Sequence, residues 1–256
     1  MDQPAINKEE CEKLESQWTN MADWYAKNIE VASTQGMVTC AVMANMPQCK
    51  RVIEVACGPG VHSKILATSF LNRDGGVQVS CDYSGGMVKA LKKTFEQEGD
   101  YTLAPGNKFL MDADTDYNEF VEGSTSELKN KCDLDKIIGE QGSFNKFVYG
   151  CQANNECLPF PSNYFEAYLA PLSLMLVNNH KNMISEAFRV TKSGSRSVFT
   201  IWGNEEKSLM FTLAKVIVRR YVPEYEARHI SANFDLWADK GAQLKIDLEA
   251  AGFTSI

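Results

Sequence analysis

The 256-residue sequence is short of the features that mark several protein classes. Its eight cysteines include no C-x-x-C pair, it has only three histidines, and no apolar run approaches the ~18 residues of a membrane-spanning helix. Lys and Arg number 26 against 33 Asp and Glu, which gives a formal net charge of −7. These absences argue against a zinc ribbon, a membrane span and the counterion-release affinity of a basic protein for nucleic acid.

The lack of a disulfide framework and of a targeting segment indicates the cellular compartment in which we expect the protein. Several cysteines lie inside apolar runs, at residues 52–57 and 77–81, where buried reduced thiols explain them better than a disulfide framework. The first 15 residues have neither the apolar core of a signal peptide nor the Arg-rich character of a transit peptide. We expect a soluble cytoplasmic protein, or a mitochondrial matrix protein if a presequence has been removed.

Apolar periodicity predicts an alternation of strands and helices. Short β-branched runs predict strands at 50–56, 77–82, 146–151, 164–172 and 197–202, and the start of another at 253–256. Three- and four-residue spacing predicts helices within 1–46, 63–71, 87–95, 181–190, 209–221 and 242–251. Gly194 is expected to close the helix at 181–190. Such alternation predicts a doubly wound, mostly parallel, Rossmann-like α/β sheet in a single domain, 1–256.

Residues 98–145 interrupt this rhythm and are predicted to be an insertion, with weak helical signals at 117–121 and 134–138. Residues 111–140 hold nine acidic residues and three lysines, which is −6 of the net −7. The run Asp112-x-Asp114-x-Asp116 resembles the first half of a calcium loop, but it lacks the Gly and Glu that such a loop needs further on. We expect this segment to form a solvated acidic surface that holds no metal.

A glycine turn follows the strand at 50–56, in Cys57-Gly58-Pro59-Gly60. It fits neither the dinucleotide pattern G-x-G-x-x-G nor a P-loop. The strand at 77–82 ends in Asp82, 22 residues after Gly60, close to the ~20-residue offset of a ribose-binding carboxylate. Two plainer readings stay open: the glycines could form only a tight turn in a non-binding domain, and Asp82 could be a helix N-cap.

Five passages, taken in order, resemble the class I S-adenosylmethionine-dependent methyltransferases, and in particular the small-molecule branch that includes the ubiquinone/menaquinone C-methyltransferases. These passages are residues 54–60, 82–87, 154–161, 164–167 and 186–194. In the family's terms they look like the cofactor loop, the ribose strand tip, the adenine loop, the entry to the fourth strand and the run before the fifth. The resemblance implies S-adenosylmethionine as cofactor and S-adenosylhomocysteine as product.

The resemblance also implies roles for individual residues. Glu54 would orient the loop and the methionine amino group, and Asp82 would hold the ribose. Asn154 stands where the family usually has Asp, and it would keep an acceptor for an adenine N–H. The other residues implied at the cofactor are Tyr25, Ala56, Cys57, Gly58, Gly60, Tyr83, Met87, Asn155 and Pro171. The helices of residues 1–46, with Trp18, would cover the cofactor.

Methyl transfer depends mainly on positioning, so no fixed catalytic residue is required. His180 is a weak candidate base, and its context equally suits a solvated helix entry. Apolar residues near the expected site predict a rim that suits a small, partly apolar acceptor, and residues 203–240 are a possible substrate lid. The rim residues are Leu172, Leu174, Met175, Trp202 and Met210. The sequence after the fourth strand lacks the Asn/Asp-Pro-Pro-Tyr of nucleobase methyltransferases, so no nucleic acid substrate is expected.

A second hypothesis is a methyltransferase-like structural or regulatory subunit, with or without bound cofactor and without turnover. The insertion at 98–145 would be a docking surface for a protein partner. The sequence also stops at 252–256, where the family begins a sixth strand and adds an antiparallel seventh, so the sheet's C-terminal edge would be incomplete and exposed. A partner could cover that edge.

Overall fold

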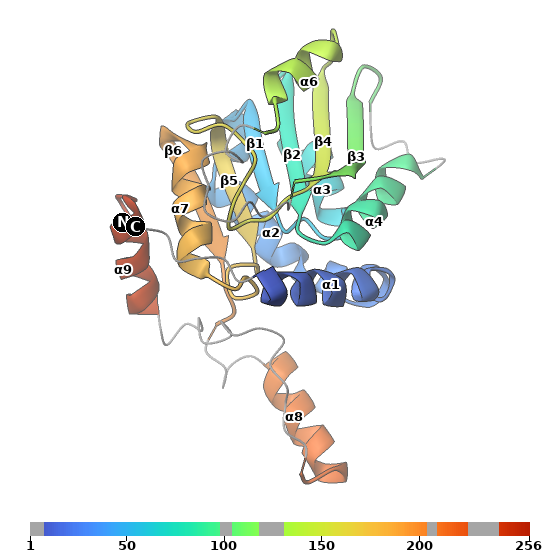
Figure 1. The fold of residues 1–256 in the computed structure, drawn as a ribbon, viewed down its shortest axis with the longest axis vertical. Coiled ribbons are helices and arrows are strands. Elements are labelled where there is room, and N and C mark those ends of the chain that lie inside the picture. Colours follow the sequence, from blue (N-terminus) through green and yellow to red (C-terminus); the bar gives the residue numbers. More distant parts are fainter. Residues whose placement is uncertain (1–7, 98–103, 118–130, 204–208, 225–240) are drawn as a thin grey trace.

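The computed structural model describes residues 8–97, 104–117, 131–203, 209–224 and 241–256. Their centre is a six-stranded sheet in the order β3-β4-β2-β1-β5-β6, and every pairing is parallel. Figure 1 shows the sheet with helices on both sides. The strands are β1 (Arg51–Val55), β2 (Gly76–Asp82), β3 (Lys108–Asp116), β4 (Lys146–Gln152), β5 (Phe165–Pro171) and β6 (Thr191–Thr200).

Helices connect the strands and cover the two faces. The α-helices are α1 (Lys8–Asn28), α2 (Thr34–Met43), α3 (Val61–Ile65), α4 (Gly85–Glu96), α6 (Leu134–Glu140), α7 (His180–Val190), α8 (Leu209–Tyr221) and α9 (Gly241–Ala251). Two 3-10 turns, η1 (Glu30–Ser33) and η2 (Met46–Gln48), and a π-helical turn, η3 (Leu66–Phe70), complete the described elements. The predicted doubly wound α/β fold is therefore confirmed.

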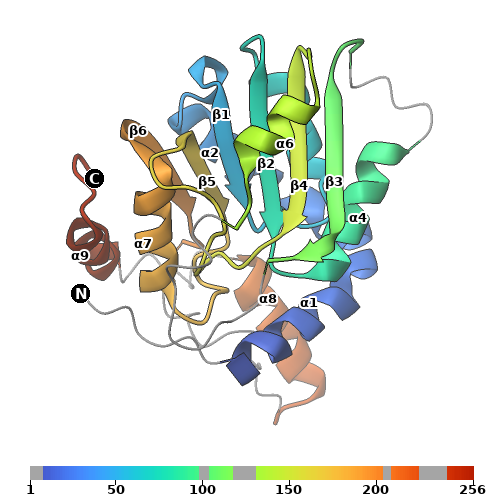
Figure 2. The ribbon, with the colours of Figure 1, turned by 45° about the horizontal axis from the view of Figure 1, so that its top comes forward.

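Each face of the sheet has its own core, because successive side chains of a strand point to opposite faces. Ile53 and Val55 belong to the cluster that includes α6, α7 and α9, and Val52 belongs to the cluster that includes α2. A third cluster lies under α4, around Leu91 and Phe95. Figure 2 shows α6 and α7 on the near face of the sheet.

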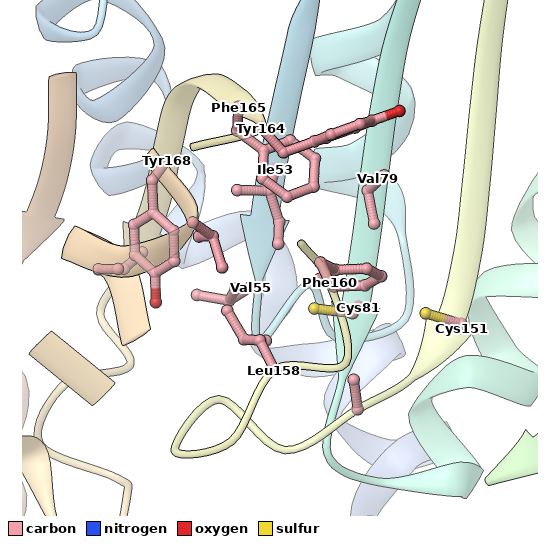
Figure 3. Packing of buried hydrophobic residues seen from close by; sticks show 14 of the residues in the cluster. Ile53, Val55, Val79, Cys81, Cys151, Leu158, Phe160, Tyr164, Phe165 and Tyr168 are labelled. Atoms are coloured by element: carbon pink, nitrogen blue, oxygen red, sulfur yellow. The ribbon is translucent and has the colours of Figure 1, made fainter. Parts of the chain in front are cut away.

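The cysteines are part of these cores. Figure 3 shows the thiols of Cys81 and Cys151 among Ile53, Val79 and Phe160. All eight cysteines are buried, and none forms a disulfide. Burial raises the pKa of the Cys81 and Cys151 thiols well above their usual range, so they stay protonated. The prediction of buried thiols is confirmed.

The winding direction of the sheet changes at β1. From β1 the chain adds β2 beside it, then β3 at the edge and β4 between β2 and β3, and later returns to place β5 and then β6 on the other side of β1. Val52–Glu54 pair with Ala167–Leu169 of β5 on one side, and Arg51–Val55 pair with Val77–Cys81 of β2 on the other. Open α/β sheets bind their ligands beyond the carboxyl ends of the strands at such a switch point.

Three details differ from the sequence-based expectations. The segment 98–145 contributes the edge strand β3, which runs parallel to β4, so this segment extends the sheet rather than only interrupting it. Gly194 is left-handed, at φ +79°, but α7 ends at Val190, where the N–H of Thr191 donates to the carbonyl of Ala187. Gly194 lies instead in the bulged start of β6. Residues 253–256 form no strand.

Parts of three predictions fall outside the described residues. These are residues 98–103 and 118–130 of the insertion, including most of the 117–121 helical signal, and residues 204–208 and 225–240 of the lid. The helical signal at 134–138 is confirmed by α6. Among the described residues, no helix is long and apolar enough to cross a bilayer, and no group of His, Cys, Asp and Glu is arranged to hold a metal.

Candidate cofactor pocket

A pocket opens at the carboxyl ends of β1, β2, β4 and β5, where the winding of the sheet reverses. It encloses about 890 Å³ of empty space, including its open mouth. Its walls come from α1, η1 and the loops that follow the four strands. The residues that line it include Cys11, Trp18, Tyr25, Glu30, Ala56, Cys57, Gly58, His62, Asp82, Tyr83, Met87, Asn154, Asn155, Glu156, Pro171, Leu172 and Ser173.

The floor of the pocket is the glycine turn after β1. Ala56, Gly58 and Gly60 have φ values of +51°, +61° and +99°, so the chain passes through left-handed conformations at alternate residues. At Gly60 a Cβ would lie 2.4 Å from Leu91 Cδ1, so this glycine permits close packing on α4. At Gly58 the nearest atom to a Cβ would be Tyr25 Cε1, at 3.9 Å. Gly58 lines the pocket and Gly60 does not.

Asp82 is tied to this turn. Its Oδ2 accepts a hydrogen bond from the Gly58 N–H at 2.9 Å, and its Oδ1 accepts one from the Ser84 N–H at 2.9 Å. The helix N-cap is Ser84, whose hydroxyl accepts from the Met87 N–H, so the N-cap reading of Asp82 is wrong. Burial raises the pKa of Asp82 to about 6, against the effect of the two N–H donors. The carboxylate is therefore fixed in place, and each oxygen keeps a further lone pair for a ligand.

Glu54 lies behind the turn, on β1, and is fully buried. Its Oε2 accepts hydrogen bonds from the Ser63 hydroxyl at 2.6 Å and the Ser80 hydroxyl at 3.0 Å. Its Oε1 has no hydrogen-bond partner within the described residues. Burial raises the pKa of Glu54 to about 8, because the two hydroxyl donors offset only part of the cost of burying the charge.

Glu30 brings a second buried carboxyl to the pocket from η1. Its Oε1 accepts from the Val61 N–H at 2.7 Å, at the first turn of α3, and burial raises its pKa to about 7. The carbonyl of Glu30 accepts from His62 Nε2 at 2.9 Å, and burial lowers the pKa of His62. His62 is therefore neutral and gives the neighbouring carboxyls no positive charge.

The loop after β4 forms the wall beside Asp82, because the Ala153 N–H donates to the carbonyl of Asp82 at 2.9 Å. Asn154 Oδ1 accepts from the Glu156 N–H at 2.9 Å, whereas Asn154 Nδ2 is buried without a partner among the residues described. Asn155 Oδ1 is likewise buried and unpaired there. Glu156 Oε1 accepts from the Asn178 N–H at 2.8 Å, and burial raises the pKa of Glu156 to about 7.

Helix α1 lies along the lower edge of the sheet in Figure 1. Its Trp18 and Tyr25 line the pocket and pack edge to face, with ring centroids 5.7 Å apart. The helix is fastened to the start of α4, where the Thr19 hydroxyl lies 2.8 Å from that of Ser84 and accepts from the Gly86 N–H. That these N-terminal residues cover a bound cofactor stays a prediction.

The pocket gathers all the cofactor residues implied by the sequence except Glu54 and Gly60, which lie behind it. Their contact with a cofactor stays a prediction. His180 does not line the pocket: its Nε2 is 2.9 Å from Asp247 Oδ2, which joins α7 to α9. Leu174 and Met175, predicted on the acceptor rim, are core residues. Leu172 does line the pocket, and the side chain of Met210 lies outside the description.

Sequence reasoning missed several lining residues. Cys11 comes from a segment with no chemical motif of its own, and Ser173 is one of many serines. Glu156 did carry one signal, since it lies inside the passage that resembles the adenine loop. Cys11 becomes visible only once α1 is placed over the sheet.

Comparison with known proteins agrees with this geometry. Residues 131–199, from just before α6 into β6, match the family described as "Methyltransferase domain". The chain is 38% identical over 63 residues to the ubiquinone/menaquinone biosynthesis C-methyltransferase of Erwinia tasmaniensis. This match covers 23% of this chain and 25% of that protein. The corresponding enzyme of Francisella tularensis is 37% identical over 65 residues, covering 24% and 26%. The chain thus matches about a quarter of the length of these curated relatives.

A solved structure covers more of the chain. The structure of a candidate S-adenosyl-L-methionine-dependent methyltransferase from Methanococcus maripaludis aligns with 100% of this chain and 90% of its own, at a TM-score of 0.53 and 13% identity. At that identity the likeness shows the fold. The chain thus has the fold of the class I S-adenosylmethionine-dependent methyltransferases, and part of its sequence resembles that family.

Proposed function

We propose that the protein transfers a methyl group from S-adenosylmethionine to a small, partly apolar acceptor. The observation that carries the proposal is the pocket at the switch point between β1 and β5, where Asp82 is fixed by the N–H groups of Gly58 and Ser84. A carboxylate held in this way would accept hydrogen bonds from both hydroxyls of a ribose.

The unpaired polar atoms of the pocket suit S-adenosylmethionine. Buried polar groups in folded proteins are almost always paired, so unpaired ones call for a ligand or water. Asn154 Nδ2, Asn155 Oδ1 and Ser173 Oγ are buried without partners in the described structure, and all three residues line the pocket. Carboxyls surround it while no described Lys or Arg lines it, which favours a ligand with positive charge.

When bound, the cofactor supplies an electrophilic methyl group on a sulfonium, which passes to the acceptor as the sulfur–carbon bond breaks and S-adenosylhomocysteine remains. The chain's own part is positioning and exclusion of water. Trp18 and Tyr25 cover the pocket from α1, and Leu172 and Pro171 form its wall at the end of β5. Their apolar surface suits a partly apolar acceptor beside the methyl group.

The test is calorimetric titration of the purified chain with S-adenosylhomocysteine. We expect a dissociation constant in the micromolar range for the wild type. Asp82→Ala should abolish binding, and Asp82→Asn, which keeps an acceptor for a loop N–H, should weaken it about 100-fold, because a fixed charge-assisted contact is lost. Asp74→Ala removes an exposed carboxylate outside the pocket and should bind like the wild type.

The titration, together with a methyl-transfer assay in a cell extract, separates the two hypotheses. A wild-type chain that binds neither S-adenosylmethionine nor S-adenosylhomocysteine would contradict the proposal. A chain that binds them but transfers no methyl group to any small molecule in a cell extract would fit the subunit role instead. Transfer of labelled methyl to an extractable small molecule, lost in Asp82→Ala, would support the enzyme.

A further inference from the structure

We infer that the start of α4 is a docking site for α1, and that Thr19 and Gly86 are positioning residues whose contact sets how fast the cofactor enters and leaves the pocket. This inference rests on the proposed function. Both Figure 1 and Figure 2 show α1 beside α4. Cys11 Sγ also accepts from Asn178 Nδ2, a weak bond because sulfur is a poor acceptor. Side chains on one face of α1 line the pocket, namely Cys11, Leu14, Trp18 and Tyr25.

The first three N–H groups of α4 are paired, and α1 pairs two of them. A helix leaves its first N–H groups without partners inside the helix. Here the Gly85 N–H donates to Glu15 Oε1 at 3.1 Å, and the Gly86 N–H donates to Thr19 Oγ1 at 3.0 Å. The third N–H donates to the hydroxyl of Ser84, the N-cap. Glu15 and Thr19 are four residues apart, so they lie on one face of α1 and cap α4 together.

Gly86 allows the two helices to approach closely. A Cβ at this position would lie 2.7 Å from Thr19 Cα and 2.8 Å from the Thr19 carbonyl oxygen, and these backbone atoms cannot rotate away. Two consecutive glycines are unfavourable in a helix by propensity, so their presence at 85 and 86 needs another reason. The close contact with α1 supplies that reason at Gly86. A larger residue there would displace α1.

The docking contact is bonded to the pocket carboxylate without lining the pocket. The Thr19 hydroxyl donates to Glu15 at 2.7 Å, so the Ser84 hydroxyl, 2.8 Å away, donates to Thr19. The N–H of Ser84 donates to Asp82 Oδ1. Thr19, Ser84 and Gly86 are not among the lining residues. A change at Thr19 or Gly86 therefore acts on the position of α1 and removes no group that touches the ligand.

The two attachments of α1 differ in burial. Its C-terminal end leads into η1, where Glu30 accepts from the Val61 N–H and from His62 Nε2, and both Glu30 and His62 are buried. At α4, Thr19 is exposed and Glu15 is half-buried. Water can replace the bonds at the exposed contact, whereas breaking the buried ones leaves polar groups unpaired. Helix α1 therefore opens by leaving α4 and turning about η1, and the ligand passes while it is open.

The test follows exchange of S-adenosylhomocysteine by stopped-flow measurement of tryptophan fluorescence, since α1 carries Trp18 and Trp24. Thr19→Val keeps the shape of the side chain but removes the hydroxyl that pairs the Gly86 N–H. Because the contact does not touch the ligand, we expect the association and dissociation rate constants both to rise about tenfold. The dissociation constant should then change less than about threefold. Thr19→Ser keeps the hydroxyl and should exchange the ligand at the wild-type rates.

Gly86→Ala displaces α1 instead of loosening it. Ala favours a helix more than Gly does, so α4 itself is preserved. We expect the dissociation rate constant to rise about tenfold more than the association rate constant, which weakens binding about tenfold, because Trp18 and Tyr25 move away from the pocket. Gly139→Ala is the matched control. It lies in α6, where a Cβ would meet nothing within 4 Å, and both rates should equal those of the wild type.

Amide hydrogen exchange tests the docking contact without a ligand. Faster exchange of α1 in Thr19→Val and Gly86→Ala, with α7 unchanged, would support it, and unchanged exchange of α1 would overturn it. Wild-type ligand rates in both variants, or slower association, would overturn the role in cofactor exchange. A wild-type chain that binds no S-adenosylhomocysteine would contradict the proposed function and that role together, and hydrogen exchange would still decide whether α1 docks on α4 as inferred.

Discussion

The buried carboxyl of Glu186 differs from those of Glu30 and Glu54 in how completely it is paired. Glu186 on α7 accepts from Arg189 Nε at 2.8 Å, from Arg189 Nη2 at 2.6 Å and from the Leu158 N–H at 2.8 Å. Arg189 also donates to the carbonyls of Leu158 and Phe160. In this network the charge of the carboxylate is matched and its oxygens are used.

The carboxyls beside and behind the pocket are different. Glu30 lines the pocket and Glu54 lies behind it; each has one buried oxygen without a partner among the described residues, and burial raises both pKa values. The loop 153–164 joins the pocket to the paired network, since Asn154 lines the pocket and Leu158 is bonded to Glu186. The paired network fixes this loop, whereas the two carboxyls near the glycine turn keep unused acceptor oxygens.

The largest effect is expected in the paired network. Arg189→Ala would leave Glu186 buried without its cation and two carbonyls of the loop without their donors, and should lower the free energy of unfolding by about 3–5 kcal/mol. Arg189→Lys keeps the charge but not the planar fork, so it should cost less. Denaturant unfolding followed by tryptophan fluorescence measures both.

If Arg189→Ala cost less than about 1 kcal/mol in free energy of unfolding, the network would not fix the loop. We expect S-adenosylhomocysteine, added to the folded Arg189→Lys variant, to bind as it does to the wild type. That result would separate the role of the network in stability from that of the pocket in binding.

The second effect concerns pH. Glu54 and Glu30 have pKa values of about 8 and about 7 in the fold, raised by burial from an ordinary value of 4.5. Such carboxyls bind protons more tightly in the folded than in the unfolded state. The free energy of unfolding that this proton binding contributes is fully present below about pH 4.5 and is lost as the pH rises through about 8. We expect the ligand-free melting temperature to fall between about pH 5 and pH 8.5.

Glu54→Gln tests the source of this fall. The amide can still accept from Ser63 or Ser80 but cannot ionise, so the fall between about pH 5 and pH 8 should be reduced by roughly a few kcal/mol in free energy of unfolding. Differential scanning calorimetry across this range measures it. An unchanged pH profile in Glu54→Gln would assign the effect to other groups. S-adenosylmethionine, which carries a positive sulfonium, should raise the melting temperature more at pH 8.5 than at pH 6.

The central sheet could be predicted from the sequence because its strands are buried on both faces and appear as continuous apolar runs, such as Val52–Val55 around one acid. The edge strand β3 could not, because five of its nine residues are Asp, Thr or Lys and its Leu110 is 39% exposed. Its Asp112 has a structural partner, the hydroxyl of Tyr149 at 3.1 Å, that no local pattern indicates.

The site was partly predictable for a similar reason. Gly58 and Asp82 follow adjacent strands, so their meeting at one edge follows from parallel pairing alone. Glu30 and Cys11 reach the pocket through the placement of α1 and η1, which depends on packing between segments distant in sequence. The orientation of the Asn154 side-chain amide depends on one hydrogen bond within a turn, which its oxygen accepts from the Glu156 N–H. No sequence pattern indicates which amide atom this bond uses.

The smallest effect concerns backbone strain in the pocket. Ala56 lies at φ +51°, where an L-residue costs roughly 1 kcal/mol more than glycine. Ala56→Gly should therefore raise the free energy of unfolding by about 0.5–1 kcal/mol, after allowing for the greater freedom of glycine in the unfolded chain, and the melting temperature by about 2–4 °C. A lower melting temperature would mean that packing of the Ala56 methyl outweighs the strain. Binding of S-adenosylhomocysteine should change little, because the hydrogen bond between the Gly58 N–H and Asp82 is retained. A large loss of binding would instead show that the ligand needs the strained backbone itself.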